Sequence, residues 1–207
     1  GRLVLLVTST GAWADFGTGD VAWTNSASGN GTITCKSVTP LDASYYTVTI
    51  TVTPATGYSI VGSSIVVANA ADADQIVDIT EAAGTNYGAS RDITFICPKA
   101  WTGVNLTATF EPNMVSIGDN KYPSLASAFD AVSDGQTVTI KIDNIIDETG
   151  ATYSFPGGTR NITIDLNGKN VSFARHIDGK NGNLSFINGT GTVEFGNISN
   201  AGDVIIR

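Results

Sequence analysis

The stretch "ITIDLNGKNVSF", Ile162 to Phe173, decides the fold of the C-terminal half of this 207-residue chain. Its apolar positions recur 22 residues later in "LSFINGTGTVEF", Leu184 to Phe195. The matching pairs are Ile162 with Leu184, Ile164 with Phe186, Val171 with Val193 and Phe173 with Phe195. A fixed period of this length predicts short strands that stack on their own repeats as a parallel β-solenoid.

The same period extends in both directions. Backwards, it places Ile140 on Ile162 and Ile142 on Ile164. Forwards, the segment Val204 to Ile206 fits when the step is shortened by about two residues.

A second interpretation of this stretch uses its corner residues Asn167 and Gly168. An Asn-Gly pair between two apolar runs also suits a two-residue type I′ hairpin, with Ile164 opposite Val171. Periodicity alone leaves the solenoid and the hairpin both open.

The stretch "YPSLASAFDAVSDGQTVTI", Tyr122 to Ile140, predicts one short helix that runs into a strand. Ser124 is placed as the N-cap and Gly135 as the C′ residue that ends the helix. One apolar stripe at helical spacing consists of Leu125, Ala128, Phe129 and Val132. A helix of under three turns is not stable alone in water, so this stripe is expected to be packed.

Together these two stretches resemble the N-terminal cap and first coils of pectate-lyase-like right-handed β-helix proteins, over residues 115 to 207. The resemblance implies a short right-handed parallel β-helix capped by one α-helix, which lies across the open end of the first coil. It implies a fold and no particular activity.

Residues 31 to 110 show a different pattern, in which apolar residues alternate with polar ones at period two. Such alternation predicts antiparallel strands with one buried face, and threonine dominates the outward positions. Four strands are expected, around residues 32 to 35, 47 to 53, 92 to 97 and 106 to 110. Because the character of the chain changes near Pro112, we expect an antiparallel β-sheet or sandwich domain over 1–112 and a helix-capped β-helix segment over 113–207.

The N-terminal domain also carries a resemblance of its own. "YYTVTITVTPATGYSIVGSSIVV" followed by "ITFICPKAWTGVNLTATFEP" resembles a bacterial surface-repeat family, over residues 30 to 112. This resemblance implies a β-domain displayed on a bacterial cell surface.

The formal charge of −8 and the pI near 4.4 repel phosphate backbones and argue against nucleic acid as a partner. No apolar run reaches the roughly 20 residues needed to span a bilayer, so membrane insertion is not expected. The start, "GRLVLLVTSTGAWADFG", fits the remnant of an export signal at residues 2–14, ending in an A-x-A site at Ala12 to Ala14. The segment Leu3 to Thr8 also fits a first strand, and both interpretations can hold together.

Asp143 and Asp165 are the candidate binding residues, because the 22-residue register stacks them on the outward face of adjacent coils. Adjacent strands lie roughly 5 Å apart, so two carboxylates there require a bound cation such as calcium, a raised pKa, or side chains that splay into water. The splayed pair is the favoured outcome. A pair at this separation also serves retaining glycosidases, which makes it the first place to look for an enzyme.

Cys35 and Cys97 both fall on the inward parity of their strands. In an exported protein they can form a disulfide, and two buried thiols are the alternative.

The remaining candidates are weaker. His176 stands in a polar turn segment without partners for a metal site or a catalytic triad. The acidic segment 72–81 lacks the EF-hand pattern, since Ile76 and Val77 occupy the positions of an oxygen ligand and a glycine. Aromatic residues that could stack on a sugar are Trp13, Trp23, Trp101, Tyr45, Tyr46, Tyr58 and Tyr87. Turn-forming asparagine accounts for most of the sequons, at Asn30, Asn105, Asn161, Asn170, Asn183, Asn188 and Asn197.

We therefore expect a secreted or cell-surface bacterial protein with a non-enzymatic adhesion, glycan-binding or stalk role. Its expected partner is an extracellular glycan or a host or cell-surface protein, and no cofactor is expected apart from the calcium considered above. The alternative is a fragment of a carbohydrate-active enzyme, a polysaccharide lyase or glycoside hydrolase of the pectate-lyase-like type.

Overall fold

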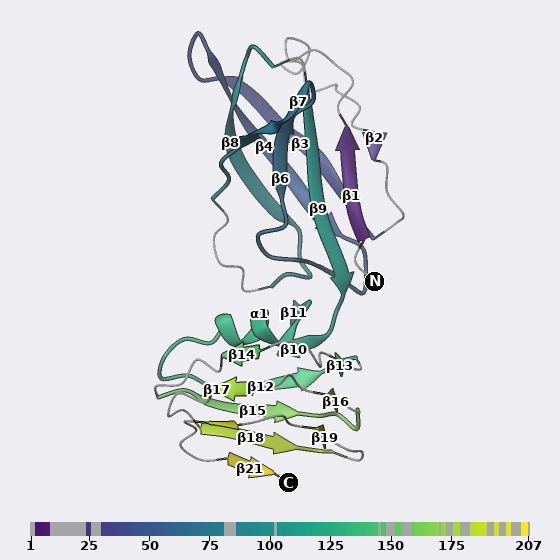
Figure 1. Ribbon diagram of the computed structural model, residues 1–207, viewed down its shortest axis with the longest axis vertical. Coiled ribbons are helices and arrows are strands. Elements are labelled where there is room, and N and C mark those ends of the chain that lie inside the picture. The colour runs from purple at the N-terminus through teal and green to yellow at the C-terminus, as the bar shows by residue number, and fades with distance from the viewer. Residues whose placement is uncertain are drawn as a thin grey trace. The chain divides into compact units, whose positions relative to one another are not determined.

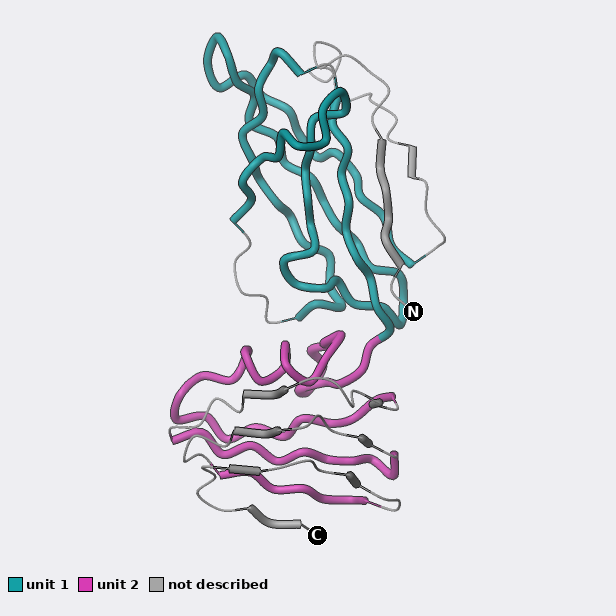
Figure 2. Tube along the Cα trace, in the orientation of Figure 1, with its two compact units in different colours: residues 1–112 teal, residues 113–207 magenta. Residues whose placement is uncertain are grey.

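The computed structural model describes residues 3–8, 24–25, 30–80, 86–101, 103–144, 146–147, 152–154, 159–169, 171–172, 176–178, 183–189, 193–194, 198–199 and 204–206. The chain is mostly β and divides into two compact units, Gly1–Pro112 and Asn113–Arg207 (Figure 2). Each unit is described by itself.

The first unit contains two antiparallel sheets (Figure 1). One sheet has the strand order β2-β1-β9-β6-β7, and β5 also pairs with β9. Its strands are β1 (Leu3–Thr8), β2 (Thr24–Asn25), β5 (Tyr58–Ile60), β6 (Val66–Asn69), β7 (Asp72–Val77) and β9 (Val104–Pro112). The other sheet, in the order β3-β4-β8, contains β3 (Gly31–Pro40), β4 (Tyr45–Pro54) and β8 (Arg91–Pro98).

The inward residues of these two sheets form one core, as in a β-sandwich. Ile33, Ile50 and Phe95 come from the three-stranded sheet, and Leu106 and Phe110 come from β9 of the other. The four strands predicted from alternation are therefore confirmed, and they are shared between two packed sheets. The N-terminal segment Leu3–Thr8 is a strand that pairs along its whole length with β9.

The second unit begins with a hairpin that the sequence analysis missed. Strands β10 (Val115–Ile117) and β11 (Asn120–Tyr122) pair around a two-residue turn, in which Gly118 has a φ of +57°. Glycine with positive φ at the first turn position is the signal of a type II′ hairpin. Strand β10 also pairs antiparallel with β12 (Thr137–Ile142), so it covers the backbone edge of that strand.

After β12 the chain visits three parallel ladders in turn (Figure 1). The first contains β12, β15 (Asn161–Asp165), β18 (Asn183–Ile187) and β21 (Val204–Ile206). The second contains β13 (Ile146–Asp147), β16 (Val171–Ser172) and β19 (Val193–Glu194). The third contains β14 (Thr152–Ser154), β17 (His176–Asp178) and β20 (Ile198–Ser199).

These parallel ladders exclude the hairpin interpretation of the Asn167-Gly168 corner. Strand β15 pairs with β12 and β18, whereas β16 pairs with β13 and β19. Asn167 and Gly168 do take positive φ, and Lys169 N donates to Leu166 O at 2.8 Å. The turn geometry is therefore present, but it leads the chain into a different sheet.

The 22-residue period is confirmed from β15 to β18, where Ile162 pairs with Leu184 and Ile164 with Phe186. It also holds from Val171 to Val193, and the last step is shorter by two residues, from Leu184 to Val204. The predicted pair of Phe173 and Phe195 lies outside the described residues.

The prediction was wrong for the first step, because Ile140 pairs with Ile164 and not with Ile162. That step covers 164 − 140 = 24 residues. An even shift keeps every side chain on its own face, so alternation cannot detect it.

Helix α1 (Leu125–Asp130) starts where the sequence predicted. The Ser124 side chain accepts a hydrogen bond from Ser127 N at 3.1 Å. All four stripe residues are buried: Leu125, Ala128, Phe129 and Val132. The predicted end was wrong, since Ala131 is the C-cap, and Gly135, with a φ of +80°, lies in the following turn.

Asparagine side chains connect neighbouring strands of the first ladder. Asn183 Nδ2 donates to Asn161 Oδ1 at 2.7 Å, and Asn161 Nδ2 lies 3.5 Å from Thr137 Oγ1. These amides are used in packing between strands, which gives two of the sequons a structural role. Asn170 and Asn197 lie outside the described residues.

Candidate functional site

The outward face of the three-stranded sheet β3-β4-β8 is lined almost entirely by hydroxyl groups. The alternating burial of these strands sends every second side chain to solvent. We call this surface the threonine face, and it consists of Thr32, Thr34, Lys36, Ser37, Thr39, Thr47, Thr49, Thr51, Thr53, Asp92 and Thr94. It forms because each strand carries β-branched threonine at positions that pack well on a pleated, half-buried surface.

The residues of the threonine face stand in rows across the three strands. Thr49 has Ser37 on one side and Thr94 on the other, and Thr49 Oγ1 lies 2.9 Å from Thr94 Oγ1. At one end, Ser90 Oγ donates to Thr53 Oγ1 at 3.0 Å. A hydroxyl has one donor and two acceptor lone pairs, so these contacts orient the groups and leave capacity for a ligand.

Lys36 and Asp92 are the two charged members of the threonine face. A β-bulge between Cys35 and Ser37 puts the extra residue Lys36 on the outward side, and its Nζ lies 2.6 Å from Asp92 Oδ2. Asp92 also accepts a hydrogen bond from Thr51 Oγ1 at 2.7 Å. The hydrogen bonds from Lys36 and Thr51 hold the pKa of Asp92 below its ordinary value. Because the two charges oppose each other at contact distance, the face is close to neutral.

Apolar side chains are exposed where the threonine face meets the loop between β3 and β4. Ile96 lies opposite Thr47, and Tyr45 is the next outward residue of β4. Leu41 lies in the loop and its N donates to Tyr45 O at 3.0 Å. We call Leu41, Tyr45 and Ile96 the Tyr45 end. The sequence signal for it was Ile96, an apolar residue at an outward position of an alternating strand.

The predicted pairing of Asp143 with Asp165 was wrong. The 24-residue first step puts Lys141, and not Asp143, beside Asp165. Asp165 Oδ1 accepts hydrogen bonds from Asn167 N at 2.9 Å and from Asn188 Nδ2 at 3.0 Å. Asp165 therefore shapes the corner of the ladder.

Asp143 follows strand β12 and has a cationic neighbour of its own. Its N donates to Met114 O at 2.9 Å, and its Oδ2 lies 3.6 Å from Lys121 Nζ. Each carboxylate thus has a lysine from another strand near it, and the two-carboxylate arrangement expected for a cation or a glycosidase is not formed by this pair.

Of the two alternatives for Cys35 and Cys97, the structure has two free thiols and no disulfide between them. Cys35 lies opposite Ile50 and Cys97 opposite Tyr46, on the two strands that flank β4. Two strand spacings are about 10 Å, beyond the roughly 7 Å that a disulfide allows between Cα atoms. Cys97 is buried in the core, and burial raises the pKa of its thiol to about 12.

The other sequence candidates belong to other elements of the chain. His176 begins strand β17 opposite Thr152, so its assignment to a turn was wrong, and its side chain is outside the described residues. In the acidic segment, Asp72 and Asp74 lie on strand β7. No cluster of three metal-ligating side chains occurs among the described residues, which do not include Glu81.

Of the aromatic candidates that the structure describes, Tyr45 alone lies on the outward side of the sheet β3-β4-β8, next to the threonine face. Tyr46 and Trp101 pack partly against the core. Lys99 Nζ lies 4.9 Å from the centre of the Tyr46 ring, and Arg91 lies over the Tyr87 ring at 4.7 Å. Trp13 and Trp23 lie outside the described residues.

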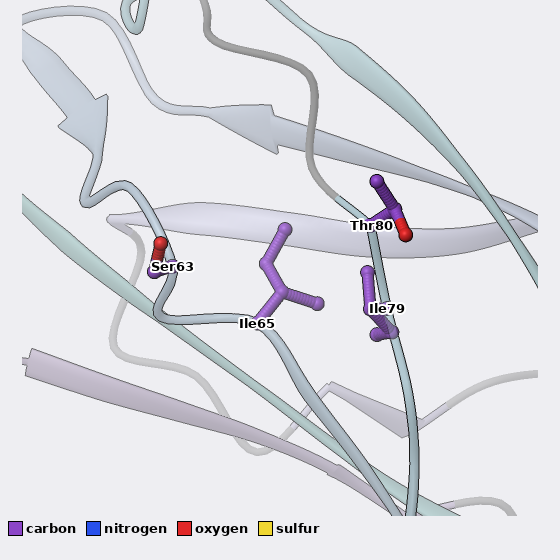
Figure 3. A pocket seen from close by; sticks show the side chains of 4 residues that line it. All are labelled: Ser63, Ile65, Ile79 and Thr80. Atoms are coloured by element: carbon purple, nitrogen blue, oxygen red, sulfur yellow. The ribbon is translucent and has the colours of Figure 1, made fainter.

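A separate hollow of about 380 Å³ in the first unit is lined by Ser63, Ile65, Ile79 and Thr80 (Figure 3). Figure 3 shows the Ile65 side chain between Ser63 on one side and Ile79 with Thr80 on the other. Two hydroxyls and two aliphatic side chains supply neither charge nor metal ligand, so we assign no function to this hollow.

Comparisons with known proteins add little to this picture. No family model matches the chain, and no curated protein matches it. Among solved structures, it is similar to the envelope protein VP37 from White Spot Syndrome Virus, with 15% identity, 53% of this chain and 94% of that chain covered, and a TM-score of 0.32. This similarity is too weak to carry an argument. Within the described residues, no helix has the length and hydropathy needed to span a bilayer.

Proposed function

We propose that this chain is an exported bacterial cell-surface protein with a non-enzymatic, glycan-binding role, and that the threonine face is its binding surface. One observation carries the proposal: a broad row of hydroxyls on a rigid sheet, whose two charges oppose each other. Hydroxyls in fixed positions match the hydroxyls of a sugar, because both donate and accept hydrogen bonds.

We also propose that the second unit is a short right-handed β-helix with a stalk role. Its support is the order of the strands, which pass through three parallel ladders and return to the first. The buried stripe of α1 and the pairing of β10 with β12 fit a capped N-terminal end of such a coil. A stack of this kind is suited to a stalk, because each coil contacts its neighbours only.

The alternative, a carbohydrate-active enzyme, followed from the resemblance to pectate-lyase-like proteins, and the first place to look for its site was the pairing of Asp143 with Asp165. Since Lys141 stands beside Asp165 and Lys121 near Asp143, this observation no longer favours an enzyme. Export and surface display are supported by composition, since 14% of residues are charged and solubility depends on hydroxyl and amide groups.

The test is a glycan array combined with a screen for polysaccharide degradation, using the whole chain. We expect binding without degradation. Thr94→Lys puts an unpaired charge in the middle of the threonine face and should abolish binding. The matched control is Thr139→Lys, which changes an exposed strand threonine of the second unit. Binding that survives Thr94→Lys, or release of products from a polysaccharide, contradicts the proposal.

A further inference from the structure

We propose that the Tyr45 end anchors the ligand and that the ligand is an uncharged glycan, with one sugar ring stacked on Tyr45. This inference rests on the proposed function and deepens it by naming the class of glycan and the anchoring residue.

The first observation is the exposure of three large apolar side chains at one place. The exposed fractions are 52% for Leu41, 42% for Tyr45 and 50% for Ile96, in a chain whose other described apolar side chains are mostly buried. Ile96 and Tyr45 are diagonal neighbours across β4 and β8, because Thr47 lies directly opposite Ile96. Side chains in this relation are within reach of each other on one sheet face.

The second observation is that the loop holding this cluster is tightly hydrogen-bonded. Asp42 Oδ1 accepts hydrogen bonds from Ser44 N at 2.7 Å and from Tyr45 N at 2.9 Å. Lys99 N donates to Ser44 O at 2.8 Å, which ties the loop to the end of β8. A pre-organised anchor loses little conformational entropy when it binds, so it favours affinity.

The third observation is the chemistry around the Tyr45 ring. An aromatic ring offers a flat apolar surface to the C–H face of a pyranose, and tyrosine adds a polar hydroxyl at its tip. Thr47 and Thr39 stand opposite each other in the next row and bring hydroxyls to the edge of a ring stacked there. This combination of a ring with nearby hydroxyls fits a sugar better than an apolar partner.

The fourth observation is the local charge. The charged residues of the threonine face are Lys36 and Asp92, and those of the two segments next to the Tyr45 end are Asp42, in the loop before β4, and Lys99, just after β8. These four residues include two of each sign. The whole chain has a formal charge of −8, so an anionic glycan is repelled at long range. The two lysines already have partners, Lys36 in Asp92 and Lys99 in the Tyr46 ring. A neutral glycan is not repelled by the net negative charge and does not need a free basic group.

The test uses titration calorimetry of the whole chain with named probes: cellohexaose, xylohexaose, mannohexaose and chitohexaose as neutral glycans, and hexagalacturonate as the anionic one. We expect at least one neutral probe to bind and the anionic probe not to bind. Tyr45→Ala should weaken binding by roughly tenfold or more, as for other aromatic anchors. Tyr45→Trp should retain it, and Ile76→Ala, which changes an exposed apolar residue on strand β7, should leave it unchanged.

A failure of the Tyr45 anchor and a failure of the proposed glycan binding give different results. Neutral binding that is lost in Thr94→Lys but kept in Tyr45→Ala overturns the anchor and leaves the proposed function intact. Binding of hexagalacturonate alone overturns the neutral class. No binding to any probe or to the array overturns both proposals. Self-association that depends on Tyr45, measured by sedimentation velocity, overturns the sugar in favour of a second copy of the chain.

Discussion

Lys36 on β3 reaches across β4 to Asp92 on β8, with 2.6 Å between Lys36 Nζ and Asp92 Oδ2. The contact exists because the bulge in β3 puts two consecutive residues, Lys36 and Ser37, on the outward side. It removes the net charge from the centre of a face that is otherwise lined by hydroxyls. A bulge thus determines the electrostatic character of the proposed binding surface.

Lys36→Met is expected to raise the pKa of Asp92 toward its ordinary value without reaching it, because Thr51 still donates to the carboxylate. In the wild type, the pKa of Asp92 is lower in the folded protein than in the unfolded chain. The ionised Asp92 therefore stabilises the fold at pH values above its unfolded pKa, and this stabilisation is lost as the pH falls through its folded pKa. A carboxyl NMR titration measures the shift, with Lys141→Met as the control. An Asp92 pKa that is unchanged by Lys36→Met refutes the ion pair.

Phe129→Ala is expected to destabilise the second unit by about 3 to 5 kcal/mol, because the ring is buried and its loss leaves a cavity. The measurement is denaturant unfolding followed by a probe in the second unit. Asp130→Ala, at an exposed position of the same helix, is the control. A loss below about 1 kcal/mol for Phe129→Ala means that the helix does not stabilise the ladders.

Gly31→Ala is expected to destabilise the first unit by about 1 to 3 kcal/mol through overpacking. A Cβ on Gly31 would overlap the Phe110 ring, and because this ring is buried, its neighbours must shift with it. A double-mutant cycle is measured by thermal unfolding of Gly31→Ala, Phe110→Leu and the double variant. In the double variant, the smaller leucine at position 110 should recover part of the stability that Gly31→Ala loses. Strict additivity of the two changes argues against the clash.

Thiol titration of the unreduced, denatured protein is expected to find two reactive thiols for Cys35 and Cys97. In the native protein Cys97 should react very slowly at neutral pH, because burial both blocks access and raises its thiol pKa to about 12. The absence of any reactive thiol in the denatured protein would show that the two cysteines do pair.

The alternating pattern of the sequence was sufficient for four strands of the first unit, β3, β4, β8 and β9, because the side-chain period of a strand is local. It did not predict β5, β6 or β7. The pattern did not reveal that β9 belongs to a different sheet from β3, β4 and β8. Which strands pair with one another depends on long-range packing. The 22-residue repeat was likewise sufficient for the register of β15 on β18, but it left parallel ladders and a hairpin both open.

The sequence by itself determined which side chains face inward, where the helix begins and which segments repeat. Only the tertiary structure decided that the first step covers 24 residues, which separated Asp143 from Asp165, and that Lys36 meets Asp92. It also brought Leu41, Tyr45 and Ile96 together from a loop and two strands. The physical reason is that face alternation repeats every two residues and is unchanged by an even shift, whereas contacts between strands depend on the absolute register.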